Sequence, residues 1–532
     1  MPIRVPKRRA TPRVIAAILL AIPMAIAVLS SLSGQAADKF IFFSSLGVTR
    51  THCIALSGAA LATLTFSKWI RRNISFIYFV TSLTLVAMIY GFAIGRYKIY
   101  PFQLFNAGDQ QVAEVRIAVK DWIYNWQDNL KLRPSRQLRP ATRPGSGVIV
   151  HNRQQMLAGP TLISGFWNDS VGVKLIDEDG AILHEWHVAY RKFRHIIKDD
   201  TDDFNVLVHG AILLPDGDIV FNYENHAMIR MDWCSEVSWI LPEPAHHSLF
   251  QDEKQHFWVP VRKIHDENTK HYPLLDGAYY EDFLAEISPE GKILRQFSII
   301  DAMYKGGFEA ALFNGRGRIM VDNWQMQQHM PDKNAGDDFD ISNGEVVADI
   351  THLNSVTILS EENASHFPMF KAGDILVSLR NLSMIAVIRP ETGQVVWTQI
   401  GPFLRQHDAH FLDDGTILLY DNRPDWSNGQ ELGGSRIAVI DPLTRQLSII
   451  YQGNTSDPFY ARIGGKVQQL ENKNLLISDF ESGRAFEVTP AGETVWEFIN
   501  RYDKTHIARI TQATRYPSQF AGLSEKTCAG RR

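Results

Sequence analysis

The sequence is poor in cysteine, and its positive and negative charges nearly cancel. Its 532 residues contain three cysteines, Cys53, Cys234 and Cys528, too few for a disulfide-rich scaffold or a cysteine-based zinc module. The net charge of −4 excludes the basic footprint of a nucleic-acid-binding protein. The sequence also lacks a glycine-rich phosphate loop and a carboxylate pair arranged for acid/base work. It leaves open whether Cys234 and Cys528 pair.

Long uncharged apolar runs occur only near the N-terminus. Residues 14–33 and 74–95 are each long enough to cross a bilayer as a helix, and residues 53–70 form a weaker third span. Basic residues precede 14–33 and follow 53–70, so the positive-inside rule puts both positions in the cytoplasm. The sequence therefore predicts a membrane anchor over 1–98, in the inner (cytoplasmic) membrane, with the remaining chain on the periplasmic or extracytoplasmic side. A cleaved signal peptide is the alternative for the first span and leaves the sidedness unchanged.

A connecting segment over 99–150 follows the anchor. Apolar residues recur every three to four positions over 107–131, which predicts an amphipathic helix. Residues 133–147 are rich in proline, arginine and glycine and predict a linker. The folded body is then expected over 151–520, with a short tail over 521–532.

The body repeats one phrase, in which a strand and a turn containing Asp or Pro with Gly lead into a second strand. Clear copies centre on Gly180, Gly291, Gly393, Arg445 and Gly492, and weaker copies lie near Ser235 and Gly344. A spacing of about fifty residues with several strands per unit is typical of a β-propeller. The predicted fold class is an all-β propeller of six or seven blades carrying an N-terminal α-helical transmembrane anchor.

A second phrase marks the first strand of successive blades. It begins with a histidine at His209, His247, His352 and His407, and Glu309 and Gly465 occupy the same phase. The first strand of each blade lines the central channel, so these four imidazoles are predicted to face one axis. By strand parity, the neighbouring His246 and His410 point elsewhere, and we interpret both as structural.

Arg380 belongs to the same predicted blade as His352. A guanidinium offers paired planar donors to sulfate, phosphate or carboxylate. It also disfavours protonation of nearby histidines, which keeps one of them nucleophilic. Several histidines could instead bind zinc or copper, but the charge of Arg380 opposes a metal there. We therefore predict an oxyanion site without a metal or another cofactor.

Four runs of this sequence resemble the bacterial aryl-sulfate sulfotransferases that use no activated nucleotide donor. The runs are NSVTIL…GDILVSLRNLSMIAVIRPETGQVVW, RQHDAHFLDDGTILLYDN, AHHSLFQDEKQHFWV and NLLISDFESGRAFEVTPAGETVWEF, and the resemblance covers residues 155–520. It implies a six-bladed periplasmic propeller that moves a sulfuryl group from a phenolic sulfate to a phenol. It also implies that His407 is the nucleophile forming a sulfohistidine, with His352, Arg380 and His247 at the other catalytic positions. Arg380 and His209 are expected to bind the substrate.

Two other functions compete with this interpretation. The body could be a non-catalytic, membrane-tethered propeller that serves as an interaction or assembly subunit for membrane-protein partners. It could also be a quinoprotein dehydrogenase, because ETGQVVW resembles the tryptophan-docking phrase of those propellers. The sequence has no adjacent cysteine pair and no metal-binding carboxylate set to hold a quinone, so this last function ranks lowest.

Overall fold

The computed structural model describes residues 68–97, 134–197, 203–204, 206–265, 272, 275, 279–316, 339–342, 345–425 and 427–528. The chain divides into two compact units, Met1–Trp126 and Gln127–Arg532. In the first unit, α4 (Lys68–Tyr97) contains the predicted span 74–95. Among the described residues, no helix combines the length and apolar character needed to cross a membrane. The span 14–33, nearly all of 53–70 and the helix predicted over 107–131 lie outside the described residues.

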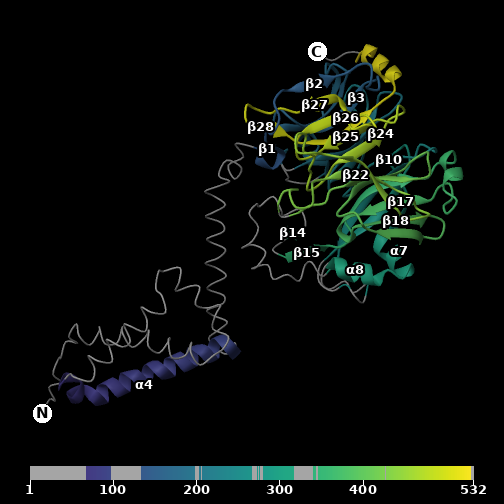
Figure 1. Cartoon of the computed structure of the whole chain (residues 1–532). Coiled ribbons are helices and arrows are strands. Elements are labelled where there is room, and N and C mark those ends of the chain that lie inside the picture. Colours follow the sequence, from purple (N-terminus) through teal and green to yellow (C-terminus); the bar gives the residue numbers. More distant parts are fainter. Residues whose placement is uncertain are drawn as a thin grey trace. The chain divides into compact units, whose positions relative to one another are not determined.

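The second unit is a six-bladed β-propeller (Figure 1). Blade 1 is β29 (Ile510–Arg515), β3 (Thr161–Trp167), β4 (Ser170–Ile176) and β5 (Ile182–Trp186). Blade 2 is β6 (Val208–Leu213), β7 (Ile219–Tyr223), β8 (Ala227–Met231) and β9 (Val237–Leu241). Blade 3 is β10 (Phe250–Gln251), β11 (Phe257–His265), β12 (Tyr279–Ile287) and β13 (Ile293–Ser298).

The other three blades have the same antiparallel order. Blade 4 is β16 (Leu353–Ile358), β17 (Ile375–Leu379), β18 (Met384–Arg389) and β19 (Gln394–Ile400). Blade 5 is β20 (His407–Phe411), β21 (Ile417–Asp421), β22 (Arg436–Ile440) and β23 (Leu447–Gln452). Blade 6 is β24 (Lys466–Gln469), β25 (Leu475–Asp479), β26 (Arg484–Val488) and β27 (Thr494–Ile499), with β2 (Gly147–His151) on its outer edge.

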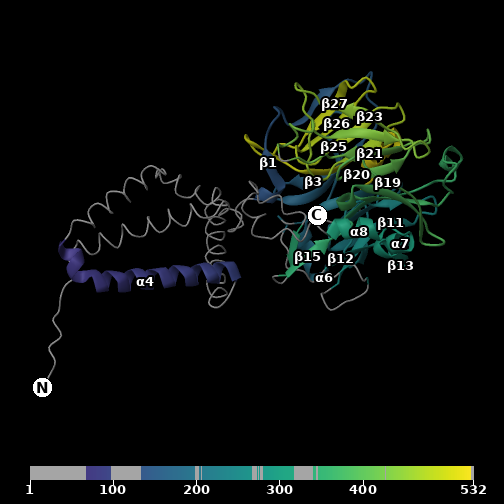
Figure 2. The ribbon, with the colours of Figure 1, turned by 60° about the horizontal axis from the view of Figure 1, so that its bottom comes forward.

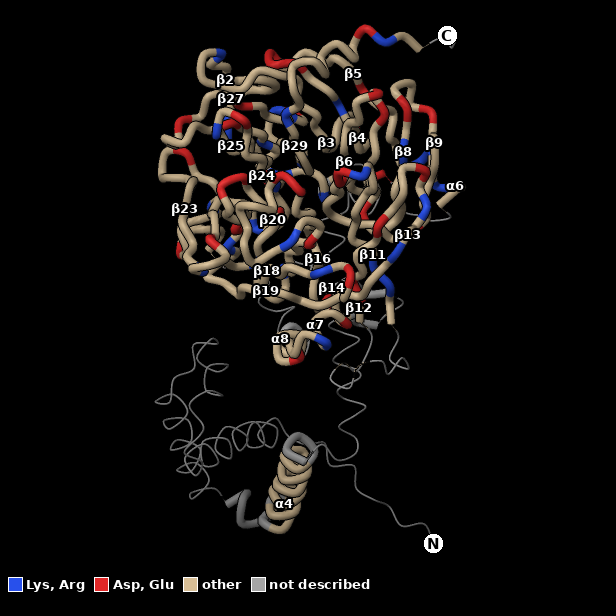
Figure 3. Tube along the Cα trace, turned by 90° about the vertical axis from the view of Figure 1, so that its right-hand side faces the viewer, with Lys and Arg blue, Asp and Glu red and all other residues tan. Residues whose placement is uncertain are grey.

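The inner strands surround the axis of the ring, and the last strand of each blade lies at the outside (Figure 3). The second strands β7, β17, β21 and β25 are buried at every position, because neighbouring blades cover both faces. The apolar residues of these strands supply much of the core between blades. The ring closes where β29, near the C-terminus, pairs antiparallel with β3 and leaves no open edge at this position.

The structure corrects the predicted seventh repeat. β14 (Phe339–Ser342) and β15 (Glu345–Asp349), around the weak copy at Gly344, form a hairpin, and β15 runs parallel to β12 and extends blade 3. Glu309, predicted to begin an inner strand, instead begins α8 (Glu309–Arg316). The alanines and the leucine of α8 are good helix formers. Along the chain, α7 (Ile299–Lys305) and α8 lie between β13 and β16. In space the two helices are neighbours (Figure 2).

The connecting segment predicted over 99–150 contains strands near its end. β1 (Leu138–Pro140) pairs with β28 (His506–Ala508), and β2 pairs with β27. Because β28 and β27 lie near the C-terminal end of the chain, no local sequence pattern predicts these pairings. The remaining described elements are η2 (Ser135–Gln137), η3 (Tyr190–Lys192), α6 (Arg194–Ile197), η5 (Asn363–His366), η6 (Arg380–Leu382) and η7 (Ser518–Glu525).

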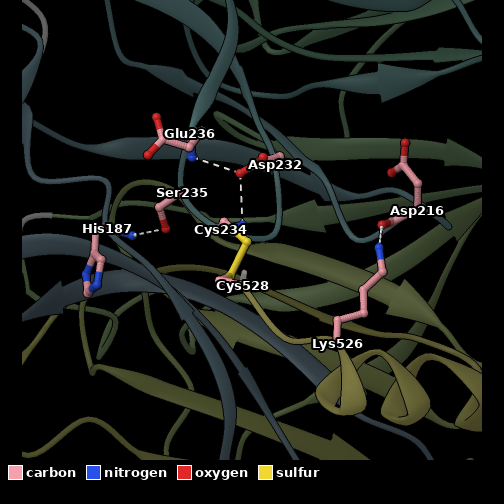
Figure 4. Close-up of a disulfide and its surroundings, with 8 residues drawn as sticks. All are labelled: His187, Asp216, Asp232, Cys234, Ser235, Glu236, Lys526 and Cys528. Carbon is pink, nitrogen blue, oxygen red and sulfur yellow. Dashed lines mark hydrogen bonds between the residues drawn. A yellow bond between two sulfur atoms is a disulfide. The ribbon is translucent and has the colours of Figure 1, made fainter. Parts of the chain in front are cut away.

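A disulfide joins Cys234 to Cys528, the pairing that the sequence left open (Figure 4). Cys234 lies in the turn between β8 and β9, where the carboxylate of Asp232 accepts its backbone N–H at 2.9 Å. Lys526, near Cys528, donates to the backbone carbonyl of Asp216 in the same blade. The segment after the ring-closing strand is thus attached covalently to blade 2.

We expect Cys528→Ser to destabilise the propeller. The disulfide links residues 294 positions apart and so restricts the unfolded chain. Removing it should lower the free energy of unfolding by about 2 to 4 kcal/mol. Denaturant unfolding of the two proteins measures this difference. A reductant should lower the stability of the natural chain by a similar amount and leave the variant unchanged. Equal stabilities without reductant would contradict the predicted contribution.

Candidate active site

Four histidines lie where inner strands of the propeller begin. His209 is the second residue of β6 and His407 is the first residue of β20, whereas His247 and His352 come just before β10 and β16. The pairing register shifts next to three of these positions, at Val208/Gly210, Leu353/Ser355 and His407/His410. Such bulges redirect side chains and are frequent beside active sites.

His247 and His352 also have unusual backbone conformations. Their φ angles are +53° and +51°, in the left-handed region that residues other than glycine seldom adopt. Backbone strain of this kind is concentrated at functional sites, where the surrounding fold maintains it. In this conformation the imidazoles of His247 and His352 lie close to those of His209 and His407.

The four imidazoles form one buried cluster. The ring centroid of His247 lies 4.5 Å from that of His209, 4.8 Å from that of His352 and 6.2 Å from that of His407. All four side chains are buried. The convergence predicted from the repeat phase is therefore present in the structure.

His407 has a defined tautomer. Its Nδ1 lies 2.7 Å from Oδ1 of Asn422, whose Nδ2 donates to the backbone carbonyls of Ala461 at 2.9 Å and Gly464 at 2.7 Å. The two carbonyls fix the amide so that its oxygen faces His407. Nδ1 of His407 must therefore carry the hydrogen, which leaves a lone pair on Nε2.

Arg380 is the only cation that we predicted for this site. It follows β17 directly, is 2% exposed, and its backbone N–H donates to the carbonyl of His352 at 3.1 Å. Burial, and next the positive charge of Arg380, hold the pKa of His407 well below its usual range. His407 is consequently neutral at neutral pH, with a guanidinium nearby.

Two carboxylates accompany the other histidines. Oε2 of Glu224 lies 3.1 Å from Nδ1 of His209, and its Oε1 lies 3.7 Å from Nδ1 of His247. Asp349, the last residue of β15, accepts a hydrogen bond from Nδ1 of His352. Burial alone would raise the pKa of Glu224, but the charge and hydrogen bond of His209 hold it below its usual range. Glu224 is therefore ionised beside two imidazoles.

A metal ion is an alternative occupant of the cluster. Nitrogens of His247, His352 and His407 lie within 4.8 Å of one another. Three imidazoles suit zinc or copper. The positive charge of Arg380, which already disfavours protonation of His407, would also disfavour a divalent cation. The guanidinium of Arg380 therefore favours an anionic ligand beside His407, whereas the ionised Glu224 lies on the side of His209 and His247.

The arylsulfotransferase (ASST) family model matches residues 210–501, more than half of the chain. The protein belongs to the arylsulfotransferase family. The matched region contains His247, His352, Arg380 and His407. No curated protein matches the chain.

Three solved structures illustrate a distant similarity to this chain. A Bacteroides caccae protein of unknown function is 12% identical with a TM-score of 0.38, and the alignment covers 64% of this chain and 94% of that one. Virginiamycin B lyase from Staphylococcus aureus is 11% identical with a TM-score of 0.30, covering 55% of this chain and 70% of that one. BamB from Moraxella catarrhalis is 11% identical with a TM-score of 0.25, covering 68% and 76% respectively.

Several residues of the histidine site were not predicted from the sequence. Asn422 and Glu224 each follow their histidine partners, His407 and His209, by 15 positions, on the chain just beyond the second strand of the blade. That shared spacing is a signal within the repeat that could have revealed both. Asp349 lacks such a signal because its strand belongs to the inserted hairpin.

The interpretation of His246 as merely structural is incomplete. His246 is fully buried, and its Nδ1 lies 2.9 Å from Nδ1 of His247 in the histidine cluster. His410 is different, because its Nε2 pairs with Asp408 at 3.0 Å and it lines a separate cavity of about 750 Å³ in the central channel. None of the four clustered histidines lines that cavity.

Proposed function

We propose that this protein transfers a sulfuryl group from a phenolic sulfate ester to a phenol through a sulfated His407. The observation that carries the proposal is the state of His407, which is neutral, with a bare Nε2, and next to a buried guanidinium. A nucleophilic histidine needs that lone pair. A sulfate ester is anionic, and the guanidinium of Arg380 supplies the positive charge that binds it. Membership of the arylsulfotransferase family supports the same reaction.

In the first half-reaction, Nε2 of His407 attacks sulfur in line with the ester bond. The S–O bond breaks, and its electron pair leaves with the phenolate. Arg380 and His352 hold the non-bridging oxygens of the sulfuryl group, where preorganised donors stabilise the transition state. In this role His352 carries hydrogens on both ring nitrogens: Nδ1–H is donated to the carboxylate of Asp349, and Nε2–H is the donor to a sulfuryl oxygen.

In the second half-reaction, a phenol oxygen attacks the sulfur bound to His407. The N–S bond breaks, and its electron pair returns to Nε2. His247 takes the proton of the phenol, since burial and the neighbouring His209 hold its pKa well below the usual range and keep it neutral. His209, which we expect to bind the substrate, stacks on Phe480 with ring centroids 5.8 Å apart.

Turnover of an aryl sulfate tests the function. The protein supplied with nitrophenyl sulfate and phenol should release nitrophenolate and form phenyl sulfate, with the parallel reciprocal plots of ping-pong kinetics. Without phenol, it should release a burst of nitrophenolate equal to the amount of enzyme. Absence of both turnover and burst would favour the non-catalytic scaffold, which should instead co-purify with stoichiometric membrane partners.

The pH dependence of the burst follows from the pKa of His407. Only the neutral imidazole attacks, and its pKa lies below the ordinary value of histidine. The burst rate should therefore stay constant as the pH falls to about 6.5, the ordinary histidine pKa, and decline only at lower pH. The measurement stops the reaction in alkali so that all released nitrophenol is detected. A rate that halves near the ordinary value would contradict this assignment.

Our proposal includes a membrane-anchored protein with its propeller outside the cytoplasm. The disulfide between Cys234 and Cys528 supports this location, because such bonds persist mainly in oxidising compartments. The basic residues beside 14–33 and 53–70 support the same sidedness, with 1–98 as the anchor. Digestion of the propeller by a protease added to spheroplasts is the expected result, and protection from the protease would contradict it.

A further inference from the structure

The adjacent side chains of His246 and His247 contact each other through the same kind of nitrogen. Their Nδ1 atoms lie 2.9 Å apart, and both residues are buried. Two N–H groups would collide at this distance, and two lone pairs would repel. One Nδ1 therefore carries a hydrogen and the other accepts it. Which residue donates determines whether Nε2 of His247 is bare or protonated.

Asp282 of β12 decides between the two arrangements. Its Oδ2 accepts from the hydroxyl of Thr351 at 2.6 Å and from the backbone N–H of Leu353 at 2.8 Å. Its Oδ1 faces Nε2 of His246 at 3.4 Å. Burial would raise the pKa of Asp282, but the 3.4 Å contact with His246 and the charge of Arg262 hold it below its usual range. An ionised carboxylate requires a hydrogen on the nitrogen that it faces.

His246 consequently carries its hydrogen on Nε2 and has a lone pair on Nδ1. The contact is then a hydrogen bond donated by Nδ1–H of His247, which leaves Nε2 of His247 bare. Burial, and next the charge of Arg262, lower the pKa of His246 to about 4, so His246 stays neutral at neutral pH. The charged groups facing His246 are Asp282, Arg262 and Glu224.

We propose that Asp282 and His246 are positioning residues that set the tautomer of His247 and present its Nε2 as the base for the acceptor phenol. This inference rests on the proposed sulfuryl transfer. The phenol proton moves to Nε2 as the new O–S bond forms and the N–S bond to His407 breaks. The resulting charge on His247 faces Glu224, whose Oε1 lies 3.7 Å from Nδ1. The other groups facing His247 are the imidazoles of His209, His352 and His407.

Asp282→Asn tests the relay with almost no change of shape. The amide oxygen can still accept from Thr351 and Leu353, while the amide NH₂ now faces Nε2 of His246. That nitrogen must then accept, so its hydrogen moves to Nδ1 of His246, and Nε2 of His247 becomes protonated. An Asp-to-Asn change in the serine-protease triad acts through the tautomer in the same way. We expect transfer from sulfated enzyme to phenol to fall on the order of 100-fold.

Two readouts separate this effect from general damage. The nitrophenolate burst should be unchanged, because attack by His407 needs no base at His247. A phenol that is already ionised at the assay pH should accept the sulfuryl group at nearly the natural rate, because it has no proton to lose. Equal losses in both half-reactions, or no recovery with the ionised phenol, would overturn the relay.

Substitutions of His246 provide an independent test. The oxygen and nitrogen of a glutamine amide can take the places of Nδ1 and Nε2, so His246→Gln should accept from His247, donate to Asp282 and keep most phenol transfer. His246→Leu should lose it on the order of 100-fold. His256→Ala is the matched control, because His256 pairs with Glu286 outside the cluster. Equal activity of the Gln and Leu variants would overturn the relay, whereas a natural chain without a burst would overturn the proposed function itself.

Discussion

His407→Ala is expected to abolish sulfuryl transfer while the propeller stays folded. The substitution removes the only atom that we assign to covalent bonding with sulfur, so both the burst and steady-state turnover should fall by about 10⁴-fold or more. The side chain is buried, and its hydrogen bond with Asn422 is lost. Leaving that amide oxygen unpaired costs about 1 to 3 kcal/mol, which a large propeller tolerates. Steady-state rates and thermal unfolding measure the two effects.

The control for His407→Ala is the removal of a histidine elsewhere in the propeller. His256→Ala should keep the natural burst and turnover, since His256 pairs with Glu286 and lies outside the cluster. A His407→Ala protein that still releases a stoichiometric burst would move the nucleophile to another residue. If His407→Ala unfolds, the same measurements are made on His407→Asn, which keeps a polar group toward Asn422 but has no nucleophile.

Arg380→Met should produce the second-largest loss. The buried guanidinium is assigned to the sulfuryl oxygens, and removing such a preorganised donor lowers kcat/KM by about 10²- to 10³-fold. The charge of Arg380 also lowers the pKa of His407, so its removal raises that pKa. The acidic limb of the burst-rate profile should therefore shift to higher pH. Burst rates measured across the pH range test both expectations.

Arg380→Lys distinguishes charge from geometry. Lysine keeps the positive charge, so the acidic limb should stay near its natural position, but it lacks the planar pair of donors. Its kcat/KM should lie between those of the natural chain and Arg380→Met. Arg153→Met is the control, because the 65% exposed side chain of Arg153 lies in a surface ion pair with Asp179. An Arg380→Met protein with natural kcat/KM and an unshifted profile would contradict the assignment of Arg380.

The repeat phase made the histidine cluster predictable from the sequence. Each inner strand begins at an equivalent position of the repeat, so the phase of His209, His247, His352 and His407 carried spatial information. Strict alternation along those strands was less informative. The left-handed backbone at His247 interrupts the alternation and brings the adjacent His246 into contact with it. Parity alone therefore underestimated His246.

Features formed by distant parts of the chain were not predictable in the same way. The strands β1 and β2 pair with β28 and β27, and Cys528 joins Cys234 across 294 positions. No local periodicity encodes such partners. The insertion after blade 3 misled the blade count because its hairpin and α8 occupy the positions where another repeat was expected. Asp349, from that hairpin, was missed for the same reason.

Mass spectrometry of the protein after exposure to an aryl sulfate tests the central claim most directly. The natural chain, mixed with nitrophenyl sulfate without acceptor and digested at alkaline pH, should carry one sulfuryl group on the peptide containing His407. Added phenol should discharge that group as phenyl sulfate, and His407→Ala should never acquire it. An unmodified natural chain after nitrophenolate release, or a sulfuryl group on another residue, would contradict transfer through His407.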